Sequence, residues 1–336
     1  FQDVTVLGAG IVGWSVAVQL LDALPNCRLT VVADQLDGET VSWVAAGSFR
    51  IENFEELCPD RPGQGRKWAA DSFQHYLDLA VSGQGSSAGC LLLPLVQVYE
   101  DSNQTPPDYL QLAHSVATLT PDQLRTEFPR WPSLQCGWSC ETTLTESRLY
   151  LPFLRARCRC TNLTVTRHRV NSLSELLDGS SCRLLFNCSG LGAAQLAKDP
   201  NVYPIRGQVF KVRAPWLKRA VIGPNGETYI YPGATDIVTV GGCRQPNSWS
   251  TEPCPDDASK IWSRATRLVP SVGGAETVNQ LAGLRPARLG GIRVELDSTD
   301  SRIVHCYGHG GNGVALAWGT ASEAVKLGLE SLRRGG

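Results

Sequence analysis

The sequence contains no methionine and carries almost no net charge, with 31 lysine and arginine residues against 32 aspartate and glutamate residues among its 336. A chain with so little net charge has no overall field to attract nucleic acid or an acidic membrane surface. One long uncharged stretch, Val4 to Leu21, approaches the length of a membrane span. Because it holds three glycines in six residues, we expect a strand, a turn and a helix there rather than a transmembrane segment. Since even an initiator methionine is missing, we expect a processed N-terminus, which leaves a removed leader open.

Several catalytic and metal-binding patterns are also missing. There is no phosphate-binding Walker A sequence and no H-E-x-x-H, and the five histidines are scattered. The twelve cysteines include C-x3-C and C-x-C spacings but no paired C-x2-C, so we expect buried thiols and no metal site. The stretch 85–89 matches G-x-S-x-G, but a helical pattern precedes it and a strand-like run follows it, the reverse of a hydrolase elbow. We therefore expect a glycine-serine loop there.

The N-terminal residues form the most informative motif. A β-branched run, Asp3 to Leu7, precedes Gly8-Ala-Gly10-Ile-Val-Gly13; a helical pattern from Trp14 to about Leu24 follows, and a second strand, Arg28 to Ala33, ends at Asp34. In this G-x-G-x-x-G turn the first glycine permits the tight turn, the second lets a pyrophosphate approach, and the third lets helix and strand pack closely. The aspartate can accept hydrogen bonds from a ribose hydroxyl. The motif predicts a bound dinucleotide, and the small, hydroxyl-bearing stretch 40–47 that follows favours FAD over NAD.

The rest of the chain suggests a nucleotide-binding domain assembled from separate segments. A buried-type strand, 182–187, leads into a second glycine turn. Residues 202–245 read as a run of strands, at 208–213, 228–231 and 237–241, and a late strand, 302–306, leads into a glycine loop and a helical tail. We predict an α/β fold: a Rossmann-like FAD-binding domain from residues 1–51, 140–200 and 284–336, and an inserted, mostly antiparallel β-sheet substrate domain from residues 52–139 and 201–283.

Several further segments, in order along the chain, resemble the FAD-dependent D-amino-acid oxidases, and more specifically their D-aspartate oxidase branch. These segments are Val6–Gly13, Val44-Ala-Ala-Gly47, Asn187-Cys-Ser-Gly-Leu191, Arg206-Gly-Gln208, Thr228–Gly233, Gly241–Arg244, Gly283-Leu-Arg-Pro286, Tyr307–Gly311 and Trp318-Gly319. The resemblance implies oxidative deamination: the α-hydrogen leaves as hydride to the flavin, no side chain acts as general base, oxygen becomes hydrogen peroxide, and the imino acid hydrolyses to a 2-oxo acid and ammonia.

The resemblance also implies site residues. Arg285 matches the family's cation for the substrate α-carboxylate, and its guanidinium is a planar two-donor fork. Tyr229 matches the family's tyrosine that donates a second hydrogen bond to the same carboxylate. Tyr231 either lines the site or packs beside it, and the carbonyl of Gly311 receives the amino group. The cofactor residues that the motif and the resemblance together predict are Gly8, Gly10, Ile11, Val12, Gly13, Asp34, Thr40, Ser42, Ala46, Gly47, Val170, Ser189, Gly310, Gly311, Gly313, Val314 and Ala315.

Substrate specificity depends on two arginines. Arg244 stands where D-aspartate oxidases place an arginine against the distal carboxylate, and Arg50 stands where enzymes for neutral substrates carry a glutamine near the mouth of the site. A further arginine of some D-aspartate oxidases is Ile222 here, a serine of their glycine loop is Gly311, and the lid tyrosine of the neutral-substrate enzymes aligns near Asn225. The substrate is therefore expected to be an acidic D-amino acid, namely aspartate, glutamate or N-methyl-aspartate. Neutral or basic D-amino acids and a non-enzymatic flavin-binding role remain alternatives.

Location and assembly are less defined. The family is commonly peroxisomal, yet the chain does not end in a Ser-Lys-Leu-type address. Asn103-Gln-Thr and Asn162-Leu-Thr could accept glycans, so secretion or a cytoplasmic location stay open. The expected partners are a D-amino acid and molecular oxygen, with no nucleic acid and no membrane, and the oligomeric state is open.

Overall fold

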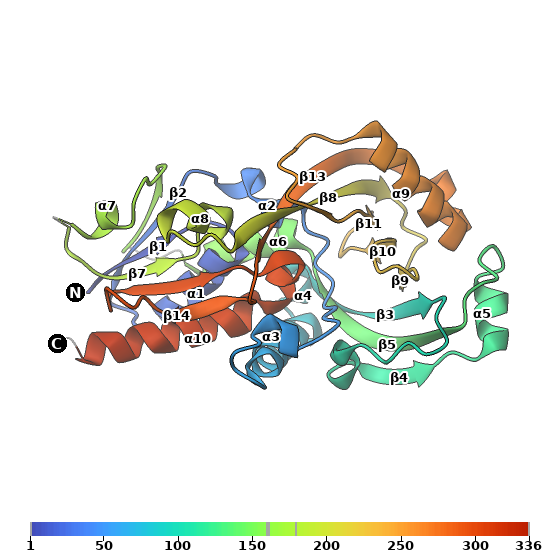
Figure 1. Ribbon diagram of the computed structural model, residues 1–336, viewed down its shortest axis with the longest axis horizontal. Coiled ribbons are helices and arrows are strands. Elements are labelled where there is room, and N and C mark those ends of the chain that lie inside the picture. Colours follow the sequence, from blue (N-terminus) through green and yellow to red (C-terminus); the bar gives the residue numbers. More distant parts are fainter. Residues whose placement is uncertain (1, 159–161, 179, 335–336) are drawn as a thin grey trace.

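The computed structural model describes residues 2–158, 162–178 and 180–334. Its strands form two sheets, which lie toward opposite ends of an elongated molecule, with both chain termini at the end that holds the smaller sheet (Figure 1). Within the described ranges, no helix is long and apolar enough to cross a membrane.

The smaller sheet is the parallel one. In the described part of the chain it has six strands in the order β14-β15-β7-β1-β2-β6, and only β14 runs antiparallel to its neighbour. The strands are β1 (Asp3–Leu7), β2 (Arg28–Ala33), β6 (Leu163–Arg167), β7 (Cys182–Asn187), β14 (Arg293–Leu296) and β15 (Ile303–Tyr307). They come from the beginning, middle and end of the chain, as expected for a discontinuous Rossmann-like unit.

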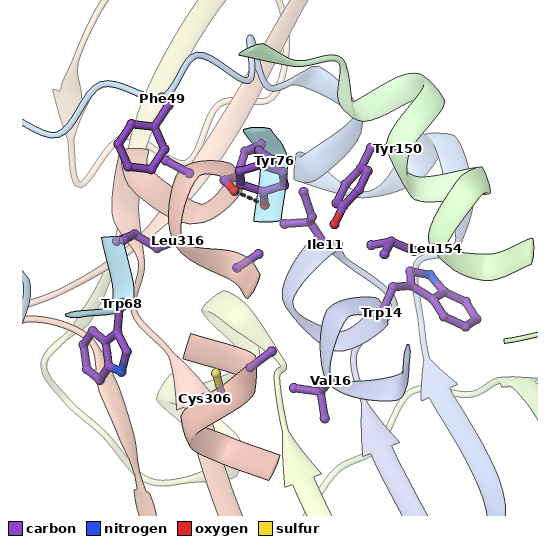
Figure 2. Close-up of a cluster of buried hydrophobic side chains, with 14 of the residues drawn as sticks. Ile11, Trp14, Val16, Phe49, Trp68, Tyr76, Tyr150, Leu154, Cys306 and Leu316 are labelled. Carbon is purple, nitrogen blue, oxygen red and sulfur yellow. Dashed lines mark hydrogen bonds between the residues drawn. The ribbon is translucent and has the colours of Figure 1, made fainter. Parts of the chain in front are cut away.

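Helices α1 (Ile11–Ala23) and α10 (Gly313–Arg334) cover one face of this sheet. Alternate residues explain the two faces: Val4 and Val6 belong to the main core beneath these helices, whereas Leu7 belongs to a smaller cluster on the other face. Figure 2 shows side chains of the main core, with Trp14 of α1 beside Tyr150 and Leu154 of α6 (Ser147–Arg157). The close packing fixes where α1 begins, and therefore where its N-terminus points.

The larger sheet is mostly antiparallel. Among the described residues it has nine strands in the order β12-β8-β11-β10-β9-β3-β5-β4, with β13 paired to β8 and only β3 and β9 running parallel to each other. The strands are β3 (Cys90–Tyr99), β4 (His114–Thr118), β5 (Cys136–Thr145), β8 (Val202–Arg213), β9 (Ala220–Ile222), β10 (Tyr229–Pro232), β11 (Ile237–Gly241), β12 (Gln245–Pro246) and β13 (Glu276–Arg288).

Period-two alternation gives this sheet an apolar and a functional face. Phe210, Ile230 and Val240 belong to the core beneath α9 (Pro255–Leu268), which packs on β8 and β11. Tyr229 and Tyr231, on either side of Ile230, must point to the opposite face. The domain boundaries remain a prediction, and two of them, at 139/140 and 283/284, fall inside β5 and β13.

The remaining helices are short except for α3. They are α2 (Val41–Val44), α3 (Gln64–Val81), α4 (Gly85–Ala88), α5 (Pro121–Glu127), α7 (Ser174–Leu177) and α8 (Ala193–Leu196), and the 3-10 helices are η1 (Asp37–Glu39), η2 (Glu55–Leu57), η3 (Asp108–Gln111), η4 (Gly190–Gly192), η5 (Pro270–Gly274) and η6 (Gly310–Asn312).

Three sequence expectations need adjustment. The first helix begins at Ile11 rather than Trp14 and therefore includes Gly13. Glycine at position 13 lets the helix pack against the preceding turn, because a Cβ there would stand 1.9 Å from the Gly8 carbonyl oxygen. The stretch 85–89, expected as a loop, forms the single helical turn α4. The strand expected from Gln208 already begins at Val202, because its first half pairs with β13.

Candidate active site

A large cavity joins the end of the parallel sheet to the functional face of the antiparallel sheet. Its volume is about 1190 Å³, and it is lined by the first glycine turn, the end of β2, strands β10 and β13 and the loop 308–315. Small-molecule pockets typically span about 300–1,000 Å³. The cavity can therefore hold an extended cofactor with a smaller molecule beside it.

One end of the cavity has the chemistry of a dinucleotide site. Gly8, Gly10, Ile11 and Val12 line it at the N-terminus of α1, whose first turn contains no acidic residue. The free N–H groups and positive dipole end of this helix favour a pyrophosphate. A Cβ at Gly10 would meet only the Ser42 Oγ, at 3.2 Å, so this glycine keeps the approach open rather than holding the protein together.

Gly13 differs from the other motif residues because it does not line the cavity. It lies against the Gly8 carbonyl instead, which is the close helix–strand packing expected of the third glycine. Asp34, at the end of β2, is exposed and lines the cavity, where its carboxylate can reach a ribose.

The other predicted cofactor residues all line the same cavity. They are Thr40, Ser42, Ala46, Gly47, Val170, Ser189, Gly310, Gly311, Gly313, Val314 and Ala315. The two hydroxyls have protein partners: the Ser42 Oγ accepts a hydrogen bond from the Ile11 N–H at 3.0 Å, and Thr40 donates to the Asp37 carbonyl at 3.0 Å. Ser42 thus holds the segment 40–47 against the α1 N-terminus, and the residues present fit FAD.

Arg285 lies at the other end, on β13. Its Nη1 donates to the carbonyl oxygens of Cys243, at 3.1 Å, and Arg206, at 3.4 Å. In the part of the chain that the structure describes, no carboxylate forms an ion pair with it. Two neutral carbonyls orient the guanidinium but leave its charge uncompensated beside a cavity, which is what recognition of a carboxylate requires.

Gly207 makes room for this arginine. A Cβ at position 207 would lie 2.4 Å from both terminal nitrogens of Arg285, so any larger residue on β8 would displace the guanidinium. On the other side, a Cβ at Gly311 would lie 3.7 Å from the Arg285 Cδ. The backbone expected to accept the substrate amino group is therefore next to the cation expected to bind its carboxylate.

Tyr229 and Tyr231 extend this wall along β10. Their rings stack with centroids 4.8 Å apart and planes 19° apart, and both line the cavity. The Tyr229 ring fills the space above Gly241 and Gly242, where a Cβ would stand within 3 Å of it. Burial raises the pKa of Tyr231 above its ordinary value, so this phenol is neutral and can donate a hydrogen bond.

The two arginines that are expected to determine substrate specificity occupy different environments. Arg244 is exposed at the cavity wall, after the end of β11, and no described residue forms a hydrogen bond or ion pair with its guanidinium. Arg50 is largely buried, with its side chain 14% exposed. Its Nη1 donates to the Gly226 carbonyl at 2.8 Å, and its Nε lies 3.2 Å from a carboxylate oxygen of Glu52.

Sequence reasoning missed several residues of this site. Gly207, the carbonyl of Cys243 and the carbonyl of Gly226 position the arginines, and Glu52 pairs with one of them. Backbone carbonyls carry no sequence signature. Only Gly207 could have been suspected from the sequence, because it lies within Arg206-Gly-Gln208, one of the segments that resemble the D-amino-acid oxidases. No group of three or more metal-ligating side chains occurs in the described ranges.

Comparisons with known proteins agree with this geometry. A family model described as FAD dependent oxidoreductase matches residues 3–327. The chain is 35% identical to a D-aspartate oxidase of Homo sapiens over 96% of its own length and 94% of the relative's, and 34% identical to a D-amino-acid oxidase of Rubrobacter xylanophilus with the same coverage. A glycine oxidase from Geobacillus kaustophilus has the same fold, with a TM-score of 0.79 at 19% identity, covering 98% of this chain and 95% of that one. The chain is therefore an enzyme of the FAD-dependent oxidoreductase family, with FAD as its cofactor, and belongs among the D-amino-acid oxidases.

Proposed function

We propose that this enzyme oxidatively deaminates acidic D-amino acids, with D-aspartate as its main substrate, to a 2-oxo acid, ammonia and hydrogen peroxide. The observation that carries the proposal is Arg285, a cation that two carbonyls orient toward the cavity, with no carboxylate pairing with it among the described residues. The 35% identity to a protein named D-aspartate oxidase supports the acidic substrate class.

The chain's own residues act by binding and orientation. Arg285 and the Tyr229 phenol hold the α-carboxylate, and the Gly311 carbonyl accepts a hydrogen bond from the amino group, which fixes the α-carbon against the cofactor end of the cavity. Bound FAD supplies the acceptor for the α-hydrogen and its electron pair, and passes two electrons on to oxygen. The substrate is left as an imino acid, which water hydrolyses, so no side chain has to act as a base.

We assign the distal carboxylate to Arg244, which lines the cavity and has no partner among the described residues. Burying a carboxylate without a partner costs several kcal/mol, so an acid-selective site needs such a cation. Neutral substrates gain nothing from it. The arrangement therefore favours D-aspartate over D-alanine.

Two measurements test the proposal. The yellow enzyme, kept free of oxygen, should be bleached by D-aspartate and not by L-aspartate. Arg244→Ala should then lower the ratio of kcat/KM for D-aspartate to that for D-alanine by at least about 10-fold. Absence of bleaching by any D-amino acid would refute the activity, and an unchanged ratio would refute the role of Arg244. A wild type that prefers D-alanine would instead favour the neutral-substrate alternative.

A peroxisomal location is a separate proposal, supported only by the family resemblance. Fractionation of cells that express the full-length protein, with a peroxisomal marker enzyme followed in parallel, tests it. Enrichment in another fraction would refute it.

A further inference from the structure

The segment that follows α2 brings two opposite charges to the substrate end of the cavity. It runs extended beside β5, with the Phe49 N–H donating to the Thr143 carbonyl at 3.0 Å. Phe49 and Ile51 are buried in the core. In extended backbone, alternate residues point to opposite sides, so Arg50 and Glu52 both face the cavity, which both of them line.

Arg50 is held so that part of its guanidinium stays available. The contacts to the Gly226 carbonyl and to Glu52 use Nη1 and Nε. A guanidinium has five N–H donors, so these two contacts do not use all of them. Gly226 permits the approach, because a Cβ there would come within 3.3 Å of Nη2.

Glu52 is itself fixed by a ladder of polar side chains. The side-chain amide of the buried Gln97 donates to the Glu52 Oε1 at 2.9 Å, and this is the same oxygen that faces Arg50. The side-chain Oε1 of Gln97 in turn accepts a hydrogen bond from the hydroxyl of the buried Tyr109 at 2.9 Å. The Tyr99 hydroxyl donates to the other carboxylate oxygen at 3.5 Å. A connected network of this kind restricts its members to one geometry, so the position of Arg50 is set from the interior of the larger sheet.

Arg50 and Arg285 flank the tyrosine pair of β10. Arg285 is bonded to the carbonyl of Cys243, next to Gly242, over which the Tyr229 ring lies. Arg50 lies close enough to Tyr231 for its charge to act on that phenol, which stacks on Tyr229. The cavity wall therefore has a cation at each end of two stacked phenols, an arrangement that fits a short molecule with a carboxylate at either end.

We propose that Arg50 is a second carboxylate-binding cation of the substrate cavity and that Glu52 is its positioning residue. This inference rests on the proposed function for the orientation of the substrate, whose α-carboxylate meets Arg285. Arg50 then binds the distal carboxylate of an acidic D-amino acid together with Arg244. Because Arg50 is largely buried and Arg244 is exposed, added salt screens the contribution of Arg244 and leaves most of that of Arg50.

The test uses the FAD-loaded full-length enzyme and the variant Arg50→Met, with Arg66→Met, an exposed arginine outside the cavity, as the matched control. The ratio of kcat/KM for D-aspartate to that for D-alanine should fall about 10- to 100-fold in Arg50→Met and stay unchanged in the control. The fall should persist at high salt. An unchanged ratio would overturn the proposal, whether the two kcat/KM values stay the same or fall by the same factor.

A binding measurement separates this proposal from the proposed function. Succinate and butyrate differ by a distal carboxylate, and their dissociation constants can be read from the change in the flavin absorbance without turnover. Arg50→Met should weaken succinate binding about 10- to 100-fold relative to butyrate. If the wild type turned over no D-amino acid, the proposed function would fail, while this comparison would still decide whether Arg50 binds a second carboxylate. If Arg50→Met failed to retain flavin, Arg50→Lys would take its place, with a smaller fall expected because the fork is lost.

The positioning role of Glu52 has its own signature. Glu52→Ala should lower the preference for D-aspartate, because it releases Arg50. Glu52→Gln should retain it, since an amide oxygen can still accept from both Arg50 and Gln97. Loss of the preference in both variants alike, or in neither, would show that Glu52 does not position Arg50.

Discussion

The substitution Gly207→Ala should displace the Arg285 guanidinium without destabilising the fold. The added Cβ would lie 2.4 Å from both terminal nitrogens of the guanidinium, whereas an ordinary van der Waals contact begins at 3.4 Å, so the guanidinium has to move by 1.0 Å (3.4 − 2.4). It lies at the far end of a flexible side chain and can move without disturbing β8. Its hydrogen bond to the Cys243 carbonyl and its approach to the substrate carboxylate cannot both survive this shift.

A 1 Å misplacement of a substrate-positioning group lowers catalysis by about 100-fold. We therefore expect kcat/KM to fall by about 100-fold for D-aspartate and D-alanine alike, because both present an α-carboxylate to Arg285. Arg285→Ala gives the reference loss, about 30- to 1000-fold for all substrates if the contact contributes about 2–4 kcal/mol. The melting temperature should stay within about 3 °C of the wild type or rise, since alanine restricts the unfolded chain.

The assay is steady-state kcat/KM on both substrates, together with flavin content and thermal unfolding. Gly83→Ala is the matched control, because a Cβ there meets nothing within 4 Å, and it should leave all three unchanged. Full activity of Gly207→Ala would refute the reasoning that the guanidinium must stay where the structure has it. A loss confined to D-aspartate would mean that Arg285 binds the side chain rather than the α-carboxylate.

Three further predictions concern the cofactor, the packing of α1 and the pH dependence of stability. Gly10→Leu should purify folded but with little flavin, because its side chain would point into the open cavity. Gly13→Ala should unfold more readily, because its Cβ would stand 1.9 Å from the Gly8 carbonyl oxygen. Flavin absorbance and thermal unfolding check both variants, and a full complement of flavin in Gly10→Leu would contradict the assigned cofactor site. Burial lowers the pKa of His75, which stacks on Trp318, to about 3, so between pH 6.5 and 3 the unfolded state binds the proton and the folded state does not. On acidification below pH 6.5, the free energy of unfolding should therefore fall more steeply in the wild type than in His75→Gln, by about 1.4 kcal/mol per pH unit. Urea titrations at several pH values measure this free energy, and equal slopes against pH in the two proteins would contradict the prediction.

The sequence predicted those parts of the fold in which local pattern and tertiary packing agree. β1, β2, β7 and β11 have the predicted bounds, because β-branched runs between turn residues pack well in a sheet. The start of α1 was wrong by three residues. A glycine in a turn motif reads as loop, and only the contact between Gly13 and the Gly8 carbonyl explains why the helix already includes it.

The site could be predicted where a motif names a side chain, and not where backbone atoms and empty space do the positioning. Gly8, Gly10, Arg285 and Tyr229 line one cavity. Arg285, however, is oriented by a pair of carbonyls and by the absent side chain of Gly207. The sequence singled out Arg50 and Arg244 as candidates for substrate specificity, but the difference between their environments was not visible there. Arg50 is buried and paired with Glu52, 44% of whose side chain is exposed, and Arg244 is exposed.

That difference decides how each cation can contribute to selectivity. The exposed Arg244 loses little solvation when a carboxylate binds, and its attraction is reduced by the surrounding water and screened by salt. Arg50 has already lost most of its solvation on folding, with Glu52 and the Gly226 carbonyl offsetting part of that cost. A substrate carboxylate that reaches Arg50 meets a cation whose geometry is fixed before binding, so less side-chain entropy is lost in the complex. The pairing with Glu52 therefore does two opposed things at once: it reduces the net charge that the substrate meets, and it keeps the guanidinium in the orientation that a carboxylate needs.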